Sequence, residues 1–161
     1  MSAMQRDKSA SGEREIAGLV RNLTGWDVRR RVRQHDGDSD LEGVPGWSVE
    51  VKRHRCASRG DVAGWWRQTI AQAERAPALP VLFFRADRDT WRAVWPLAVL
   101  LTHQKADYWR AYEWAAESAV EAWAAAARDG LCGQQSTTGG QVRISTCATA
   151  PFPLTYIGAK P

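Results

Sequence analysis

The segment from Asp40 to Lys52, D-L-E-G-V-P-G-W-S-V-E-V-K, constrains the fold of this chain more than any other. Its second half reads as a β-strand in which valines alternate with Glu50 and Lys52. Side chains alternate between the two faces of a strand, so Glu50 and Lys52 should share one face. A Pro-Gly turn precedes the strand and would return Asp40 to its side. Two carboxylates and an amine would then meet, and such a group can hold a divalent metal and handle a phosphate.

Metal-dependent cleavage of a phosphodiester is a reaction in which all of these residues could take part. The reaction needs an activated water and neutralisation of the charge that grows on phosphorus, which Mg²⁺ held by carboxylates can supply. We expect Asp40 and Glu50 to bind the metal, with the backbone carbonyl of Val51 as a third ligand. Lys52 would orient the attacking water or stabilise the charge of the transition state. The alternative is that Glu50 and Lys52 form an ordinary surface ion pair.

Two further candidates lie on predicted helices. Glu13 lies near the start of the first helix, where it could reach the metal directly or through water, or simply be an acid favoured by the helix dipole. On the second helix Gln72, or Gln68 one turn earlier, could contact a phosphate or position water. Both glutamines could equally be ordinary solvated residues.

Hydrophobic periodicity and turn residues predict an α/β fold with a mixed sheet. We expect helices at 11–24, 61–76 and 96–101, a long Ala-rich helix at 106–129, and strands at 26–32, 41–44, 47–52, 81–84 and 91–95. Ser11 would cap the first helix. These elements suggest a disordered N-terminus (1–10), a core (11–97), a helical extension (98–129) and an irregular tail (130–161), which could add a strand near 142–147.

Composition is that of one ordinary domain. The chain has 161 residues, of which 44% are hydrophobic, and nine are tryptophans. Its N-terminus is polar and no apolar run approaches the length of a membrane span, so we expect a cytoplasmic protein of a bacterium or a phage-infected host. The three cysteines are widely spaced and are expected to be reduced, and no Cys/His metal pattern appears.

Basic residues cluster at two places, although the net charge is only +4. One cluster spans 29–33 and the other spans 52–59, beside the proposed site. Such clusters suit a polyanion whose backbone must be held while a phosphate is cut, or they are a solvated basic surface. The residues expected to contact DNA are Arg29, Arg31, Arg33, Arg53, Arg55 and Arg59. The adjacent Trp65 and Trp66 could stack on exposed bases or pack in the core.

The chain resembles the PD-(D/E)XK nuclease superfamily, and within it the archaeal-type Holliday-junction resolvases and their small phage-encoded relatives. The resemblance covers residues 9–97 and rests on G-E-R-E-I-A from Gly12, the segment from Asp40 to Arg53, Q-A-E from Gln72, and the apolar strand P-V-L-F-F-R. The form D-x-x-G-x-P-G-x-x-x-E-x-K is typical of the phage-type proteins. Ser39 stands where the motif's name has proline.

This resemblance implies a restriction-endonuclease-like core in the order αβββαβ. It implies that Asp40 and Glu50 bind Mg²⁺, for which Mn²⁺ could substitute, and that Lys52 is the catalytic lysine. Glu13 matches the acid of the first helix, and Gln72 matches the glutamine of the second helix better than Gln68 does.

The function implied is that of a Mg²⁺-dependent DNA endonuclease, and the most specific expectation is a Holliday-junction resolvase or branched-DNA nuclease of phage or prophage type. Resolvases of this type are homodimers that act on opposite strands of a junction, so DNA and a second copy of the chain are the expected partners. The alternatives are a restriction-like or nicking nuclease with another DNA target, and a non-catalytic DNA-binding protein on the same fold.

Overall fold

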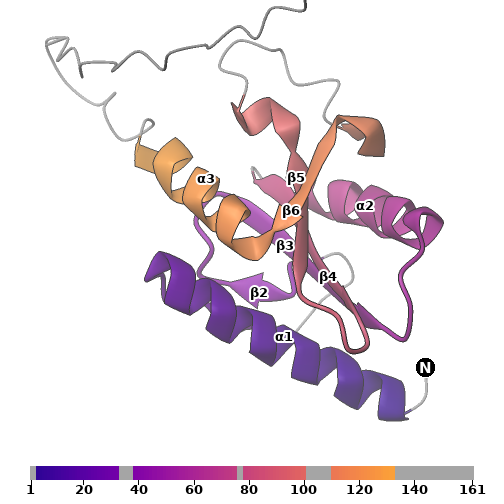
Figure 1. Cartoon of the computed structure of the whole chain (residues 1–161). Coiled ribbons are helices and arrows are strands. Elements are labelled where there is room, and N and C mark those ends of the chain that lie inside the picture. Colours follow the sequence, from indigo (N-terminus) through magenta and orange to yellow (C-terminus); the bar gives the residue numbers. More distant parts are fainter. Residues whose placement is uncertain (1–2, 33–37, 76–77, 101–109, 133–161) are drawn as a thin grey trace, which may run out of the picture.

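The computed structural model describes residues 3–32, 38–75, 78–100 and 110–132 (Figure 1). The chain begins with helix α1 (Ala3–Thr24), followed by the short strands β1 (Arg29–Arg30) and β2 (Leu41–Glu42) and the longer strand β3 (Trp47–His54). Helix α2 (Arg59–Ala73) leads to the hairpin of β4 (Leu79–Ala86) and β5 (Arg92–Pro96). The 3-10 turns η1 (Leu97–Leu100) and η3 (Tyr112–Trp114), strand β6 (Ala115–Ala119) and helix α3 (Val120–Cys132) complete it.

The main sheet is mixed, in the order β3-β4-β5-β6. β3 and β4 are parallel and are connected through α2, whereas β5 is antiparallel to both β4 and β6. β1 and β2 form a separate antiparallel pair. The apolar run at 81–84 lies inside β4 between two partners, as expected of a central strand. The predicted α/β fold with a mixed sheet is therefore confirmed.

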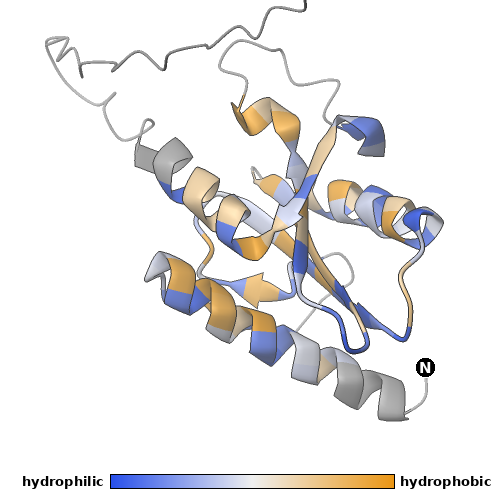
Figure 2. Cartoon of the chain, in the orientation of Figure 1, coloured by the Kyte–Doolittle hydropathy of each residue, from blue (hydrophilic) through white to orange (hydrophobic). Residues whose placement is uncertain are grey.

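Helices cover both faces of this sheet. α1 and α3 pack on one face, over alternate residues such as Val49, Val51 and Phe83. α2 packs on the other face, where Trp66 and Ile70 meet Leu82. Figure 2 shows hydrophobic residues concentrated in the C-terminal half of α1 and in the middle of the sheet. None of the helices in the described part of the chain is both long and apolar enough to cross a bilayer.

The first helix starts earlier than predicted. It begins at Ala3, so the expected disorder of residues 1–10 is wrong for residues 3–10, and Ser11 lies inside the helix rather than at its N-cap. The segment A-M-Q-R-D-K consists mostly of good helix formers, which extend the helix beyond the serine. Its end is as predicted: Thr24 Oγ1 donates to Val20 O (2.7 Å), and Gly25 follows with φ 75°.

The strands before β3 are shorter than predicted. The strand expected at 26–32 is reduced to Arg29–Arg30, and the strand expected at 41–44 is reduced to Leu41–Glu42. Val28 is buried but Val32 is 81% exposed, so the end of the first segment has no apolar face to bury. Gly43, with φ 81°, ends the second.

The long helix predicted at 106–129 is wrong over 112–119. Residues 112–114 form η3 and residues 115–119 form β6, and the helix begins only at Val120. Alanine favours helices, but pairing with β5 outweighs this preference, because Trp95 Nε1 donates to Ser118 Oγ (3.0 Å) and Arg92 pairs with Glu117 (3.0 Å). The core therefore extends past residue 97. Residues 101–109 and 133–161, including Trp109 and the strand suggested near 142–147, lie outside the described part of the chain.

Candidate active site

Asp40 is held against the middle of β3 by backbone hydrogen bonds. Its own N–H donates to Val49 O (2.8 Å), and its carboxylate Oδ2 accepts from the N–H of Val51 (2.7 Å). The N–H and C=O of one strand residue point to the same edge, so the carbonyl of Val51 lies on the edge where Asp40 lies. The turn through Gly46 (φ 75°) thus returns Asp40 to the strand as predicted.

Glu50 and Lys52 lie side by side on one face of β3. Lys52 Nζ is 2.5 Å from Glu50 Oε1, and the two side chains are 19% and 7% exposed. A surface ion pair would leave both groups in water. This pair is instead largely removed from water, which is costly for charged groups unless they are paired with each other.

The carboxyl of Asp40 carries the clearest electrostatic signal. Burial, and then the negative charge of Glu50, raise its pKa from 3.8 to about 7. The charge of Glu13 acts in the same direction, whereas the hydrogen bond from Val51 and the charge of Lys52 oppose it. The carboxyl groups of Asp40, Glu50 and Glu13 are therefore close enough for their charges to interact, and a bound cation would relieve the repulsion between them.

Glu13 comes to the site from α1 but already has two partners. It is 5% exposed, it forms an ion pair with Arg30 Nε of β1, and it accepts from Ser9 Oγ (3.0 Å). Its charge reaches Asp40, which agrees with the predicted placement near the metal. Its role as a ligand stays a prediction.

The structure separates the two candidate glutamines. Gln72 is 6% exposed, and its Nε2 donates to Ser48 Oγ and to Val49 O (both 3.1 Å). Gln68 is exposed on α2. Gln72 is thus the glutamine that reaches the strand of the site, and it fastens α2 to the backbone segment that holds Asp40.

The donor set fits a hard cation such as Mg²⁺. Among the described residues no group of three or more His, Cys, Asp or Glu side chains is close enough to hold a metal ion. Asp40 and Glu50 supply two carboxylates, and the carbonyl of Val51 is a third oxygen at the same edge. Mg²⁺ characteristically takes one or two carboxylates and completes its shell with waters and substrate phosphate.

Ser39 is a contributor that the sequence analysis did not single out. Its Oγ accepts from the N–H of Val49 (2.9 Å) and donates to Leu41 O (2.7 Å), so it bridges β2 and β3 directly beside Asp40. Its place in the motif was the available signal, because a proline there could not make these side-chain bonds. Arg30, the partner of Glu13, was inside the noted basic cluster but was not named.

Arg53 does not lie with the other proposed DNA contacts. It alternates with Lys52, and so its side chain turns toward α1, where a Cβ on Gly12 would be 3.3 Å from its own Cβ. It is 24% exposed and lies within 4.0 Å of both Glu15 and Asp87. The structure therefore places Arg53 on the face opposite to Glu50.

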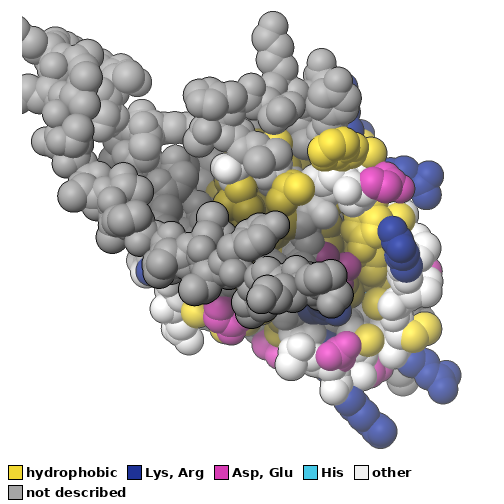
Figure 3. All heavy atoms as spheres, turned by 45° about the horizontal axis from the view of Figure 1, so that its top comes forward, with side chains coloured by type: hydrophobic (Ala, Val, Ile, Leu, Met, Phe, Trp, Pro, Cys, Tyr) yellow, Lys and Arg dark blue, Asp and Glu magenta, His cyan; other side chains and the backbone are white. Residues whose placement is uncertain are grey.

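The remaining arginines lie at the surface. Arg29 and Arg31 each form an ion pair with an aspartate, at 2.6 and 3.4 Å. Arg55 and Arg59 are exposed, and Arg33 lies outside the described residues. On the face drawn in Figure 3, Lys and Arg side chains are spread along one edge, with acidic, polar and hydrophobic groups between them. DNA contact by these arginines stays a prediction.

Of the two tryptophans, Trp66 is fully buried, so it belongs to the core. Trp65 is partly buried, with its ring 4.6 Å from that of His54 and 6.2 Å from that of Phe84.

Comparison with known proteins identifies a family and several solved structures that match this chain. The model of the family described as "Phage putative PDDEXK endonuclease" matches residues 4–119. A similar solved structure is Hjc of Archaeoglobus fulgidus, a Holliday junction resolvase from an archaeal hyperthermophile. It is 16% identical, the match covers 53% of this chain and 70% of that one, and the TM-score is 0.39. No curated protein matches the chain.

Proposed function

Because the chain belongs to this phage PDDEXK endonuclease family, we propose that it is a Mg²⁺-dependent DNA endonuclease that hydrolyses phosphodiester bonds. One observation carries the proposal. The Asp40 carboxylate accepts from the N–H of Val51 beside the buried Glu50–Lys52 pair, and its pKa is raised to about 7. A protein that only binds DNA has no need of carboxyl groups forced together in this way.

Each residue has a distinct role in this proposal. Asp40 and Glu50, with the carbonyl of Val51, would hold Mg²⁺, which when bound lowers the pKa of water and neutralises charge on the phosphate. The ammonium of Lys52, which pairs with Glu50, would stabilise negative charge on the phosphate or orient the attacking water. Gln72 keeps α2 and β3 in register through Val49.

A branched DNA, with a four-way junction as its most specific form, is the substrate that we propose. The support is the motif from Asp40 to Lys52, whose spacing resembles that of phage-type resolvases. A homodimer would place two such sites on opposite strands of the junction.

Cleavage assays on labelled four-way junctions, flaps, duplex and single strands test this function. With Mg²⁺ or Mn²⁺ we expect cutting of the junction, and with EDTA none. Lys52→Ala, Asp40→Asn and Glu50→Gln should each lower the rate by about 100-fold or more, as loss of a charge-stabilising group does elsewhere. Glu121→Gln is a matched control, because Glu121 is exposed on α3 away from the site.

Two results would contradict the proposal at different levels. If no substrate is cut, or if Lys52→Ala and Asp40→Asn cut as fast as the natural chain, the assignment of the catalytic residues is wrong. If linear duplex is cut as readily as a junction, the chain is a nuclease with another DNA target.

A further inference from the structure

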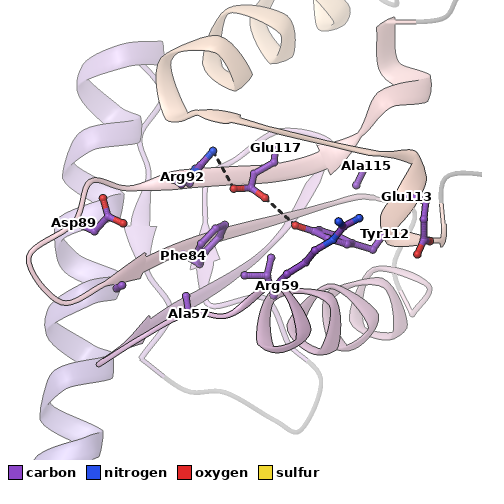
Figure 4. Close-up of a pocket in the computed structure, with 11 residues that line it drawn as sticks. Ala57, Arg59, Phe84, Asp89, Arg92, Tyr112, Glu113, Ala115 and Glu117 are labelled. Carbon is purple, nitrogen blue, oxygen red and sulfur yellow. Dashed lines mark hydrogen bonds and ion pairs between the residues drawn. The ribbon is translucent and has the colours of Figure 1, made fainter.

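A polar cavity lies on the same face of the sheet as Glu50 and Lys52. It has a volume of about 490 Å³ and lies between β4, β5, β6 and the start of α2 (Figure 4). Phe84 and Arg92 are on its sheet side, Arg59 and Tyr112 on its other walls. A cavity of this volume falls within the range of small-ligand sites. None of the proposed catalytic residues lines it.

The register of the sheet connects this cavity to the active site. Lys52 is the direct partner of Phe84, and Phe84 is the direct partner of Arg92. Paired residues in neighbouring strands point to the same face and lie about 5 Å apart. The cavity therefore begins one strand away from Lys52 and extends across β5 to β6, in a direction that a DNA strand leaving the site could follow.

Its walls carry charges of both signs around an aromatic ring. Glu117 pairs with Arg92 (3.0 Å) and accepts a hydrogen bond from the hydroxyl of Tyr112 (2.8 Å), which fixes the tyrosine ring. Burial, and then this hydrogen bond, raise the pKa of Tyr112 to about 12, so the phenol stays neutral. In Figure 4 the side chain of Arg59 lies next to Tyr112, and Asp89 and Glu113 lie toward the two ends.

This chemistry favours a nucleotide over a free anion or an apolar ligand. A bare phosphate could use the two guanidinium groups but would leave the three carboxylates, which only accept hydrogen bonds, without a donor from the ligand. A nucleotide presents a phosphate for Arg59, a π-face for Tyr112, and amino groups that a carboxylate can accept from. Since a paired base keeps both of its faces inside the stack, only an unpaired one could lie against the tyrosine ring.

We propose that this cavity binds one unpaired nucleotide of the DNA, adjacent to the phosphate at Lys52, with its phosphate on Arg59 and its base on Tyr112. The proposal rests on the proposed nuclease function and specifies its substrate as DNA with unpaired nucleotides near the cut. A branch point, a flap or a distorted junction supplies such nucleotides, and a continuous duplex does not.

Binding without metal tests the cavity separately from catalysis. Fluorescence anisotropy in EDTA would compare a labelled single strand of about 12 nucleotides, within the usual range of single-strand sites, with a duplex of the same sequence. Tyr112→Ala and Arg59→Ala should weaken single-strand binding about 10-fold, which is the usual loss for one stacked base or one phosphate contact. Binding of the duplex by Tyr112→Ala should change less than about 2-fold, well below the loss expected for one stacked base.

Two matched variants separate the cavity from general effects. Tyr112→Phe keeps the ring and should retain single-strand binding, which also shows that the position tolerates substitution. Arg67→Ala removes the same charge from an exposed position on α2 outside the cavity and should have little effect. If Tyr112→Ala binds single strands as well as the natural chain, or Arg67→Ala loses as much as Arg59→Ala, the cavity proposal is wrong.

The same samples distinguish this proposal from the proposed function. If the variants lose single-strand binding as expected but the natural chain cuts no DNA with Mg²⁺ or Mn²⁺, the nuclease function fails and the nucleotide site stands. If the natural chain cuts duplex DNA but does not bind single strands, the nucleotide site fails and the nuclease function stands.

Discussion

The environment of the Asp40 carboxyl destabilises its ionised form. Its carboxyl is mostly buried, Glu50 and Glu13 repel the ionised form, and one backbone N–H and Lys52 compensate only in part. A folded protein without metal therefore carries a free-energy cost when this group ionises. The placement of Asp40 was predictable from the Pro-Gly turn, but this cost was not, because it depends on burial and on a charge from α1.

The unfolding free energy should report this cost directly. Because the folded pKa of Asp40 is about 7 and the unfolded value is 3.8, the folded state retains a proton that the unfolded state loses between these values. In EDTA the contribution of Asp40 to stability is therefore fully present below about pH 4 and is lost as the pH rises to about 7. Asp40→Asn, which cannot ionise, should lack this loss.

Urea unfolding of the natural chain and of Asp40→Asn, from acid to neutral pH, measures the difference between their free energies of unfolding. The other titrating groups contribute equally to both proteins, so their contributions cancel in this difference. We expect the asparagine variant to gain stability over the natural chain as the pH rises from about 4 to about 7, and then to keep that gain. A constant difference across this range would show that Asp40 has an ordinary pKa.

At the scale of the element, the connection from β2 to β3 holds the site together. Gly43 has φ 81°, and a Cβ there would lie 2.1 Å from the backbone oxygen of Asp27. A side chain would thus meet both an unfavourable backbone conformation and a backbone atom that cannot move aside cheaply. The turn carries Asp40 at one end and Trp47 of β3 at the other, so its distortion would reach the active site.

Gly43→Ala should lower the unfolding free energy by about 2 kcal/mol or more, since strained left-handed backbone alone costs about 1–3 kcal/mol. Gly64→Ala, inside α2, is the matched control, because a Cβ there meets nothing within 4 Å. That change should be neutral or stabilise the helix by up to about 1 kcal/mol. Equal effects of the two changes in chemical denaturation would contradict the argument.

An element could be predicted from the sequence where the interactions that form it are local in the chain. α2 was predictable from its periodicity, and Ser58 and Asp61 form a capping box at its start. The edge strand β6 was not, because its sequence A-A-E-S-A favours a helix, and only pairing with β5 makes it a strand. Its partner β5 is separated from it by the segment between Pro96 and Ala115, so no local sequence pattern indicates the pairing.

At the scale of the whole molecule, Trp123 connects the end of the described chain to its beginning. Its side chain is fully buried, and its ring meets Phe83, Trp47 and Trp26 edge-on, with centroids 4.9, 5.5 and 6.4 Å away. α3 also packs on α1. The sequence placed Trp123 in a predicted Ala-rich helix, but nothing in that helix identifies the face of the sheet that it covers.

If α3 belongs to the same cooperative unit as the nuclease site, Trp123→Ala should destabilise the whole protein. Removal of a buried tryptophan costs about 3–5 kcal/mol, a large part of the roughly 5–15 kcal/mol that stabilises a domain. Trp114→Ala removes a ring that is 49% exposed and should cost far less. Far-UV circular dichroism in guanidinium should show one transition, moved to lower denaturant by Trp123→Ala. A second transition, with the first unmoved, would instead show that α3 is a separate extension, because its loss would then leave β3 and Asp40 undisturbed.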